Sequence, residues 1–411
     1  MHAATRPVAS RGGAMPSPRR TLTTLFLIVF TDLVGFGIVI PLLPLYAEHF
    51  HPAPWVFGLL MASYSAMQFV FSPILGRLSD RVGRRPVLLI SLLGSVGGSV
   101  LFALAHSIAW LFAARLVAGI CGGNIATAQA VIADTTPPEK RARGMGMIGA
   151  AFGLGFIAGP AIAGVLAPVG MGAPGWGAAA CSSVAWVMVL AFLPETHPRT
   201  AARASVVPPP RRSRLAFALD HRELVPLLAI GFVVVTGFAA FEVTFAQFLH
   251  DRLALSHSGV SFLFVYVGVL AAAVQGGLVG RASRWFGEHT LLLAGLAATA
   301  AGLALLATTH RLGAVLAVLP VVALGMGFVM PSLSSLVSKS AGADEQGAAL
   351  GVFQGLGSLA RVVGPFSAEL ALGAWGVAAP QLGAAVLAMT AAVGGALLLR
   401  RRLGPASTNP G

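Results

Sequence analysis

The sequence predicts an all-α integral membrane protein with twelve transmembrane helices in two pseudo-symmetric six-helix halves. Three observations support this fold class. Apolar residues make up 56% of the 411 residues and charged residues only 10%, whereas soluble proteins carry about 25% charged residues. Apolar runs of about 20 residues, long enough to cross a hydrocarbon core of about 30 Å, recur along most of the chain. A long polar interruption divides these runs six and six.

The expected membrane spans are the apolar runs, taken in chain order. They lie near 22–46, 55–75, 87–105, 109–132, 144–168, 176–194, 224–248, 258–280, 289–308, 312–338, 347–371 and 380–399. The shortest gaps between them are at 106–108 and 309–311. A chain composed in this way has little material for a water-soluble domain.

The basic residues predict how the chain is oriented in a membrane. With both termini in the cytoplasm, only Arg252 and Arg311 of the 27 lysines and arginines lie outside, and only Arg115 and Arg361 lie within a span. This bias is typical of cytoplasmic loops. We therefore interpret the net charge of +13 as a signal that orients the chain in the membrane, not as a surface that binds nucleic acid. We expect a multi-pass protein of the inner (plasma) membrane with both termini in the cytoplasm.

The polar interruption at 195–223 is rich in proline and arginine, as a flexible cytoplasmic linker would be. It separates an N-terminal half at 22–194 from a C-terminal half at 224–400. The remaining segments, 1–21 and 401–411, are expected to be cytoplasmic tails.

A weak internal repeat supports the two halves. The segment 280–287 resembles 76–83, and 364–365 resembles 159–160 at nearly the same separation along the chain. Carriers that rock one half against the other are often built from such repeats. In the second copy Arg284 stands where the first copy has an aspartate.

A short charged connection follows the second expected span. It reads Gly76-Arg77-Leu78-Ser79-Asp80-Arg81-Val82-Gly83-Arg84-Arg85. The two glycines permit a tight turn, and Asp80 can pair with an arginine or face the positive N-terminus of another helix. A turn that only sets topology would need the arginines, but neither Asp80 nor the glycines.

This connection resembles the signature loop of the major facilitator superfamily. The resemblance implies the major facilitator fold and a conformational switch loop, in which Asp80 latches the two halves in one state and the basic residues help to set the switch. The residues that match the signature are Gly76, Asp80, Arg81, Gly83, Arg84 and Arg85.

The fifth expected span carries a second pattern of small residues. It consists of Gly146, Gly155, Gly159, Pro160 and Gly164, with Ala163 at a position where the family pattern has glycine. Glycines four residues apart let helices approach closely, and a proline inside a helix kinks it. The pattern resembles the antiporter motif of the drug/proton antiporter branch, which implies a seal against proton leak between the halves.

Three charged residues inside spans are candidates for proton coupling, because such residues are costly in a membrane. The run Leu111-x3-Arg115-x3-Gly119 resembles another element of that branch and implies that Arg115 takes part in coupling; snorkelling to the outer interface is the alternative. Asp32 lies near the midplane in a helix that resembles the first helix of tetracycline and multidrug exporters. It is expected to bind and release protons, unless the backbone or Arg115 satisfies it structurally. Glu242 is the third candidate.

The expected substrate cavity is lined by residues on the same helices. Phe241 and Phe245 flank Glu242 and suit bulky amphipathic or cationic ligands, although a phenylalanine stripe is also typical of plain packing. Gln129 lies on nearly the same helix face as Arg115. The sequence departs from the tetracycline exporters in the ninth span, at 289–308, which lacks the acidic residue that they carry there. The resemblance therefore does not decide whether tetracycline is a substrate.

We interpret the chain as a secondary transporter that exports small amphipathic compounds in exchange for protons by alternating access. It has no nucleotide-binding loop and no nucleophile–base pair in a span, so it is not expected to be an enzyme. No cofactor or metal is expected. The expected partners are a small-molecule substrate, protons and the lipid bilayer, and the chain is expected to function as a monomer. The alternatives are an exporter of a native metabolite or sugar on the same scaffold, and a membrane receptor or enzyme.

Overall fold

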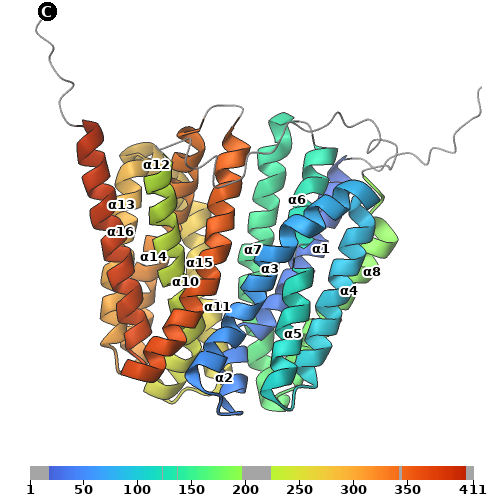
Figure 1. The fold of residues 1–411 in the computed structure, drawn as a ribbon, viewed down its shortest axis with the longest axis horizontal. Coiled ribbons are helices and arrows are strands. Elements are labelled where there is room, and N and C mark those ends of the chain that lie inside the picture. The colour runs from blue at the N-terminus through green and yellow to red at the C-terminus, as the bar shows by residue number, and fades with distance from the viewer. Residues whose placement is uncertain (1–17, 123, 137, 197–223, 342–344, 404–411) are drawn as a thin grey trace, which may run out of the picture.

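The structure, a computed structural model, is all-helical wherever it is described (Figure 1). The described residues are 18–122, 124–136, 138–196, 224–341 and 345–403. Most of the expected linker at 195–223, and most of both expected tails, therefore lies outside the described residues.

The N-terminal half consists of the helices that precede residue 197. They are α1 (Pro18–Val39), α2 (Leu43–Glu48), α3 (Pro54–Val82), α4 (Arg84–Ala103), α5 (Ile108–Cys121), α6 (Asn124–Thr135), α7 (Pro138–Leu166), the 3₁₀ turn η1 (Ala167–Val169) and α8 (Ala173–Phe192). In Figure 1 this half, coloured blue to green, stands beside the second one.

The C-terminal half follows the same plan from residue 225 onward. Its elements are α10 (Val225–Leu253), α11 (His257–Ala273), the π-helical turn η3 (Val274–Leu278), α12 (Val279–Phe286), α13 (Glu288–Ala307), α14 (Leu312–Lys339), α15 (Gln346–Trp375) and α16 (Ala379–Leu403). Eleven segments of the described chain are long and apolar enough to span a membrane. The eleventh expected span, α15, is 30 residues long and completes the expected twelve.

Three of the expected spans are interrupted, which their apolar composition did not reveal. The first divides into α1 and α2 near Pro41 and Pro44, because proline removes a helix hydrogen bond, and Pro44 is tolerated in the first turn of α2. The fourth divides into α5 and α6 after Cys121. The eighth passes through the π-helical turn Val274–Leu278, a geometry that is frequent at functional sites.

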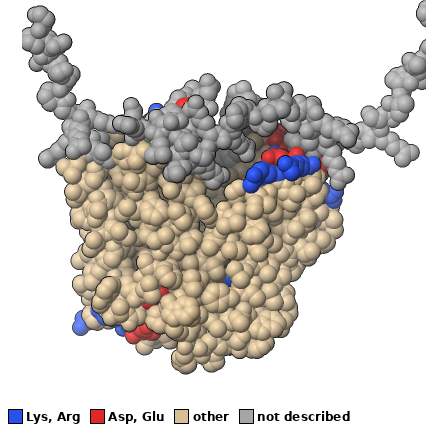
Figure 2. Space-filling model, in the orientation of Figure 1, with Lys and Arg blue, Asp and Glu red and all other residues tan. Residues whose placement is uncertain are grey.

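The molecule has two ends, which we name by their residues. The loop face carries residues 77–85, between α3 and α4, and the opposite face carries α2 (Figure 1). Figure 2 shows charged side chains gathered near one corner of the loop face, whereas the flank between the faces is almost free of charge. An uncharged flank of this kind suits contact with lipid.

The buried cores show how the two halves meet. One core contains residues of both halves, including Leu45, Tyr46, Phe57, Phe248 and Val260, and it lies toward the opposite face. Two further cores lie toward the loop face, and each is built from one half only. Over the described residues, the halves are therefore closed against each other at the opposite face and have separate cores at the loop face.

The halves meet mainly at two helix pairs, α3 with α15 and α7 with α11, and α2 also packs on α10. The two main crossings are close at glycines. A Cβ atom on Gly58 would lie 3.1 Å from the carbonyl oxygen of Phe366, and one on Gly268 would lie 3.0 Å from that of Phe156. The predicted arrangement of two packed six-helix halves is confirmed.

Candidate functional site

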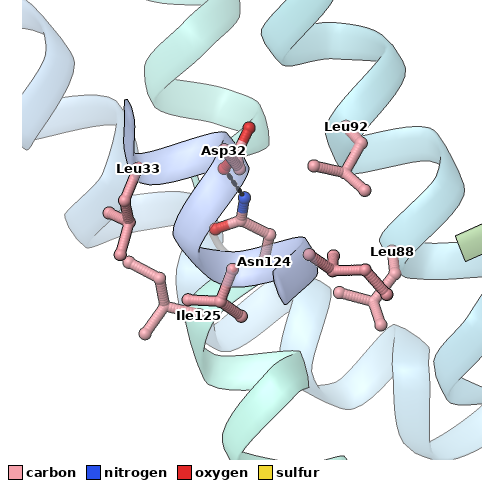
Figure 3. Close-up of a pocket in the computed structure, with 8 residues that line it drawn as sticks. Asp32, Leu33, Leu88, Leu92, Asn124 and Ile125 are labelled. Atoms are coloured by element: carbon pink, nitrogen blue, oxygen red, sulfur yellow. Dashed lines mark hydrogen bonds between the residues drawn. The ribbon is translucent and has the colours of Figure 1, made fainter. Parts of the chain in front are cut away.

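Asp32 lies in α1, where it faces α6 and α8. The Asn124 side-chain amide donates a short hydrogen bond to Asp32 Oδ2, and the Ser182 hydroxyl donates to Oδ1 at 3.1 Å. Figure 3 shows Asn124 pointing at Asp32, with Leu88 and Leu92 of α4 on the other side of the pocket. Ser95 of α4 is also within hydrogen-bonding reach, so the partners that the described residues give this acid are neutral side chains from three other helices, and Arg115 is not one of them.

Arg115 of α5 lies inside the N-terminal half, where its guanidinium stacks on an aromatic ring. Its central carbon is 4.7 Å from the centroid of the Tyr64 ring in α3, a cation–π arrangement. Its Nε is buried without a hydrogen-bond partner among the described residues. Gly119 makes this possible, because a Cβ there would lie 2.6 Å from the Tyr64 carbonyl oxygen and would push α3 away from α5.

Tyr64 connects the charged residues of the two halves. It lies in electrostatic range of Arg115 and Asp32 in its own half and of Arg361 in the other. Its ring also packs against Phe36 of α1, with the centroids 5.0 Å apart. Two of the predicted coupling residues, Asp32 and Arg115, are thus brought together around a tyrosine that the sequence analysis did not select.

Glu242, the third predicted coupling residue, lies in α10 and faces Arg361 of α15. Arg361 is exposed although it lies in the middle of its helix. The sequence had suggested no partner for this arginine, because nothing in the chain order links the seventh and eleventh spans. Each half therefore places one acid and one arginine near the middle of the bundle.

An apolar cavity opens within the C-terminal half beside these charges. It has a volume of about 210 Å³ and is lined by Phe238 and Phe241 of α10, Gln275 of the π-helical turn, and Met326 and Met330 of α14, among others. Its mostly apolar lining with one polar side chain is typical of sites for small molecules, whereas its volume lies below their usual range of about 300–1,000 Å³. Methionine also adapts easily to different ligand shapes.

Only one of the three predicted cavity residues lines this cavity. Phe241 does, whereas Phe245 is 2% exposed and stacks on Phe241 and Phe264 within the core shared by the halves. Phe245 lies one turn nearer the opposite face, where the halves are closed, and its role in a substrate cavity stays a prediction. Gln129 is an exposed residue of α6 and is not among the residues that line the cavity.

The glycines of the predicted antiporter motif pack α7 against α1. A Cβ on Gly159 would lie 2.6 Å from the carbonyl carbon of Gly37, and one on Gly155 would lie 2.8 Å from Cβ of Leu33. Pro160 lies inside the same helix. The face of α7 that meets α1 thus consists of small residues, as close helix packing in membranes requires.

Gly164 extends this motif to the boundary between the halves. A Cβ at this position would lie 3.2 Å from the Phe262 ring in α11 of the C-terminal half. Gly146 belongs to α7, but its surroundings lie outside the described residues. The motif therefore stands between the helix that carries Asp32 and a helix of the other half.

The switch loop is organised by Arg84, whose side chain is 8% exposed. Its Nη1 donates to Asp80 Oδ1 at 2.6 Å and to the Ser79 hydroxyl at 2.7 Å, and its Nε donates to Asp134 Oδ2 at 2.9 Å. Of the two partners predicted for Asp80, the arginine of its own half is the one that binds it here. Asp80 itself is 54% exposed at the loop face.

Glu195 binds the first turn of α4. The backbone amides of Arg84 and Arg85 donate to its two carboxylate oxygens at 2.9 and 3.2 Å, which satisfies amides that a helix N-terminus leaves free. Two constraints require glycine at position 83. Its φ is +107°, which other residues rarely adopt, and a Cβ there would collide with the Glu195 carboxylate. Sequence reasoning placed Glu195 at the edge of the linker and did not detect this role.

Gly76 and Arg81 do not share the roles of their neighbours. Gly76 was predicted to turn the backbone, but it is a helical residue within α3 and nothing lies within 4 Å of its would-be Cβ. The turn is made by Gly83 alone. Arg81 is an exposed residue of the last turn of α3, and Arg85 donates from Nη2 to the Leu190 carbonyl at 2.7 Å.

The C-terminal half has an ion pair in the corresponding place. Glu288 begins α13, as Arg84 begins α4, and its Oε1 accepts hydrogen bonds from Lys339 Nζ at 2.8 Å and from the Ser335 hydroxyl at 2.6 Å. Lys339 ends α14, which is the counterpart of α5 and α6. The repeat therefore extends to a contact between two helix ends, with the charges exchanged.

Comparison with known proteins agrees with this geometry. The family model described as Major Facilitator Superfamily matches residues 25–365. The chain is 36% identical to the tetracycline resistance protein, class E, of Escherichia coli, over 84% of this chain and 86% of that protein. It is 31% identical to multidrug resistance protein 1 of Bacillus subtilis, over 84% and 88%. Among solved structures, the human organic anion transporter MFSD10 matches with a TM-score of 0.69 and 26% identity, over 93% of this chain and 100% of that one.

Proposed function

Because the chain belongs to the major facilitator superfamily, we propose that it exports small amphipathic compounds in exchange for protons by alternating access. The family and the fold make it a multi-pass membrane transporter, not an enzyme. The proposal concerns the direction of transport, the coupling ion and the cargo. It also assigns the protein to the inner (plasma) membrane as a monomer, with the loop face and both termini in the cytoplasm.

The neutral surroundings of Asp32 carry the proposal. A carboxylate inside a membrane protein is costly unless a cation or a proton neutralises it. Among the described residues the hydrogen-bond partners of Asp32 are the Asn124 amide and the hydroxyls of Ser182 and Ser95, which stabilise a carboxylate without neutralising it. Such a site favours an acid that binds and releases a proton during the transport cycle.

Arg115 supports this role from the neighbouring helix. Its guanidinium is held on Tyr64 and lacks a hydrogen-bond partner for Nε among the described residues. Arg115 and Asp32 both lie in electrostatic range of Tyr64, so a movement that brings the guanidinium toward the acid would favour the charged acid, and one that takes it away would favour the protonated acid. A small movement of α3 or α5 would therefore couple proton binding to conformation.

The coupling follows from the two states of Asp32. Proton and substrate favour different openings of the carrier, so that each weakens the binding of the other. Inward flow of protons can then drive outward movement of substrate. Glu242 is proposed to contribute in the second half, where Arg361 faces it.

The apolar cavity supports an amphipathic cargo. Its walls carry Phe238, Phe241, Met326 and Met330, which suit ring systems of variable shape. The relatives include proteins named for tetracycline resistance and multidrug resistance. A second candidate cargo is an organic anion, which the exposed mid-helix Arg361 and the similarity to the human organic anion transporter favour.

A growth-inhibition screen followed by vesicle transport tests the proposal. Cells with and without the chain are challenged with tetracyclines, amphipathic dyes and amphipathic organic anions. The compound that shows the largest protection is then measured in inverted vesicles, both as uptake driven by a proton gradient and as exchange without a gradient.

Asp32→Asn is expected to abolish proton-driven uptake and to retain substrate exchange, because asparagine mimics the protonated acid. Asp32→Glu, which keeps a carboxyl group, is the matched control and should retain part of the driven uptake. Membrane levels of both variants are measured in parallel. Unchanged proton-driven uptake by Asp32→Asn would remove this acid from the mechanism.

A further inference from the structure

Two glutamates, both close to helix ends, meet at the opposite face. Glu48 ends α2 in the N-terminal half, and Glu369 lies in α15 of the C-terminal half. Glu369 is only 2% exposed. Gln247 of α10, which is also 2% exposed, lies within hydrogen-bonding reach of both carboxyl groups. These residues belong to the region where one core joins the two halves.

The hydrogen bonds of this group are incomplete. Glu369 Oε1 and Gln247 Oε1 are both buried and have no partner among the described residues. Both atoms are acceptors when Glu369 is ionised, so neither can satisfy the other. A proton on Glu369 adds one donor to this pair of acceptors. Buried polar atoms normally have partners, so a donor is the missing component.

No cation is positioned to neutralise Glu369 in the described part of the chain. The group that faces it electrostatically is Glu48, a like charge. Glu48 is faced in turn by Asp251 and His250 of α10. Arg252 of the same helix instead donates to the carbonyls at the end of α13. Two carboxylates in such surroundings cannot easily both be ionised.

The other helices around the group add no basic side chain to Glu369. His257 of α11 packs beside His250 and Tyr46, with ring centroids 5.8 and 5.7 Å away. The segment of α3 from 54 to 76 has no charged residue, and α16 contributes Gln381, which is buried with both amide atoms unpaired. No group of three or more His, Cys, Asp or Glu in the described chain is arranged to hold a metal ion.

We propose that Glu48, Gln247 and Glu369 form a second proton-binding site, separate from Asp32, that holds the opposite face closed while the proton is bound. Opening at this face would separate Glu48 from Gln247 and Glu369, because they belong to different halves. Both carboxyl groups would then meet water, and the single bound proton would be released to that side. The proton is therefore exchanged with the solution at the opposite face and is not carried across the membrane.

Proton release on opening determines how pH shifts the balance between the closed and open forms of the opposite face. Closing takes up one proton from the outer solution, so acid on that side favours the closed face. One proton taken up changes the ratio of closed to open molecules by up to about tenfold per pH unit. The inference rests on the proposed alternating opening of the two faces, but on neither the cargo nor the direction of transport.

Thiol labelling from outside tests the proposal on the full-length chain in cells. Cys121 and Cys181 are replaced by alanine, and Val260→Cys provides a reporter, because Val260 is 0% exposed in the core that closes the opposite face. A membrane-impermeant maleimide reaches this thiol only when that face opens. Labelling is divided by that of Ala374→Cys, an exposed position of α15, which corrects for the pH dependence of the reaction.

The chain without further changes should label faster as external pH rises. Glu369→Gln, which imitates the protonated acid, should label slowly at acidic and alkaline pH alike, and Glu48→Gln should flatten the response in the same way. Asp251→Asn is the matched control, because it removes an exposed acid of the same neighbourhood and should keep the response.

An unaltered pH response in Glu369→Gln or in Glu48→Gln would overturn the proposal. If one variant does not reach the membrane, the other decides the question. Asp32→Asn should keep the pH response of labelling even though it loses driven uptake. The labelling experiment therefore tests the site at the opposite face, and the transport experiment tests Asp32, so that either proposal can be refuted without the other.

Discussion

A methyl group at Gly159 tests how closely α7 packs on the helix that carries Asp32. The new Cβ would lie 2.6 Å from both the Cα and the carbonyl carbon of Gly37, and 2.9 Å from the amide nitrogen of Ile38. These are backbone atoms, so no side-chain rotation relieves the contact. The two helices must separate locally, and α1 must shift with respect to α6 and α8.

The size of the effect can be worked out with a control on the same helix. Overpacking a close contact costs about 1–3 kcal/mol, whereas alanine is better than glycine inside a helix by about 0.8–1.0 kcal/mol. At Gly153 nothing lies within 4 Å of a would-be Cβ. Because Gly153→Ala gains the same helix propensity without the contact, the two variants should differ in unfolding free energy by about 1–3 kcal/mol.

Thermal unfolding in one detergent measures this difference. Gly159→Ala should unfold at a lower temperature than Gly153→Ala, and its proton-driven transport should fall further than its membrane level does, since Asp32 lies on the displaced helix. Equal unfolding temperatures for the two variants would refute the argument, because the close α1–α7 contact would then not limit packing.

Two further substitutions test the loop and the arginine site. Gly83→Ala should lower stability by about 1–3 kcal/mol, since its backbone conformation suits only glycine. Gly76→Ala, at an uncrowded position inside α3, should instead raise stability by up to about 1 kcal/mol. The readout is thermal unfolding, and similar losses in both would contradict the assignment of the turn. Tyr64→Phe should keep most transport, because it retains the ring beneath Arg115, whereas Tyr64→Leu should lose most of it. Equal activity in a vesicle assay would show that the stacking is dispensable.

The number and kind of helices could be predicted because the signals are local. Span length and the side preference of basic residues act within each segment, so they survive without knowledge of tertiary structure. The breaks in the first, fourth and eighth spans were not predicted. A proline pair such as Pro41 and Pro44 can kink, end or merely bend a helix, and the outcome depends on what its neighbours supply to the freed carbonyls.

The charged members of the site could be predicted, and the neutral members could not. Asp32, Arg115 and Glu242 stand out because a charge inside a span is costly. Asn124 and Tyr64 are unremarkable in an apolar helix until the structure brings them to Asp32 and Arg115. Their importance comes from contacts between distant segments, which one sequence does not reveal.

The burial of Glu369 also depends on contacts between distant segments, although this residue is charged. A glutamate near a helix end would be solvated on a single helix in a membrane. The structure buries Glu369 where the N-terminal half packs against this end of α15. Its burial depends on the packing of the halves, which its distance from the end of the helix does not reveal.

The ion pairs at the loop face explain why the internal repeat is weak in sequence. Arg84 binds Asp134 between the starts and ends of two helices in one half, and Glu288 binds Lys339 in the other. The contact is equivalent, but the signs are exchanged. A search for identical residues therefore finds the glycines of the repeat and misses the pairs that stabilise it.

The exchange of sign also reaches the exposed surface of the loop face. The N-terminal half ends α3 with the carboxylate of Asp80, which is 54% exposed, whereas the C-terminal half ends α12 with the exposed Arg284. Identical copies would place like charges on both halves, and these would repel whenever the halves approached at this face. Asp80 and Arg284 instead add an attraction to a face where both helix ends also carry exposed arginines, Arg81 and Arg281. Each half also has its own internal ion pair, Arg84 with Asp134 and Glu288 with Lys339, so neither pair depends on contact between the halves.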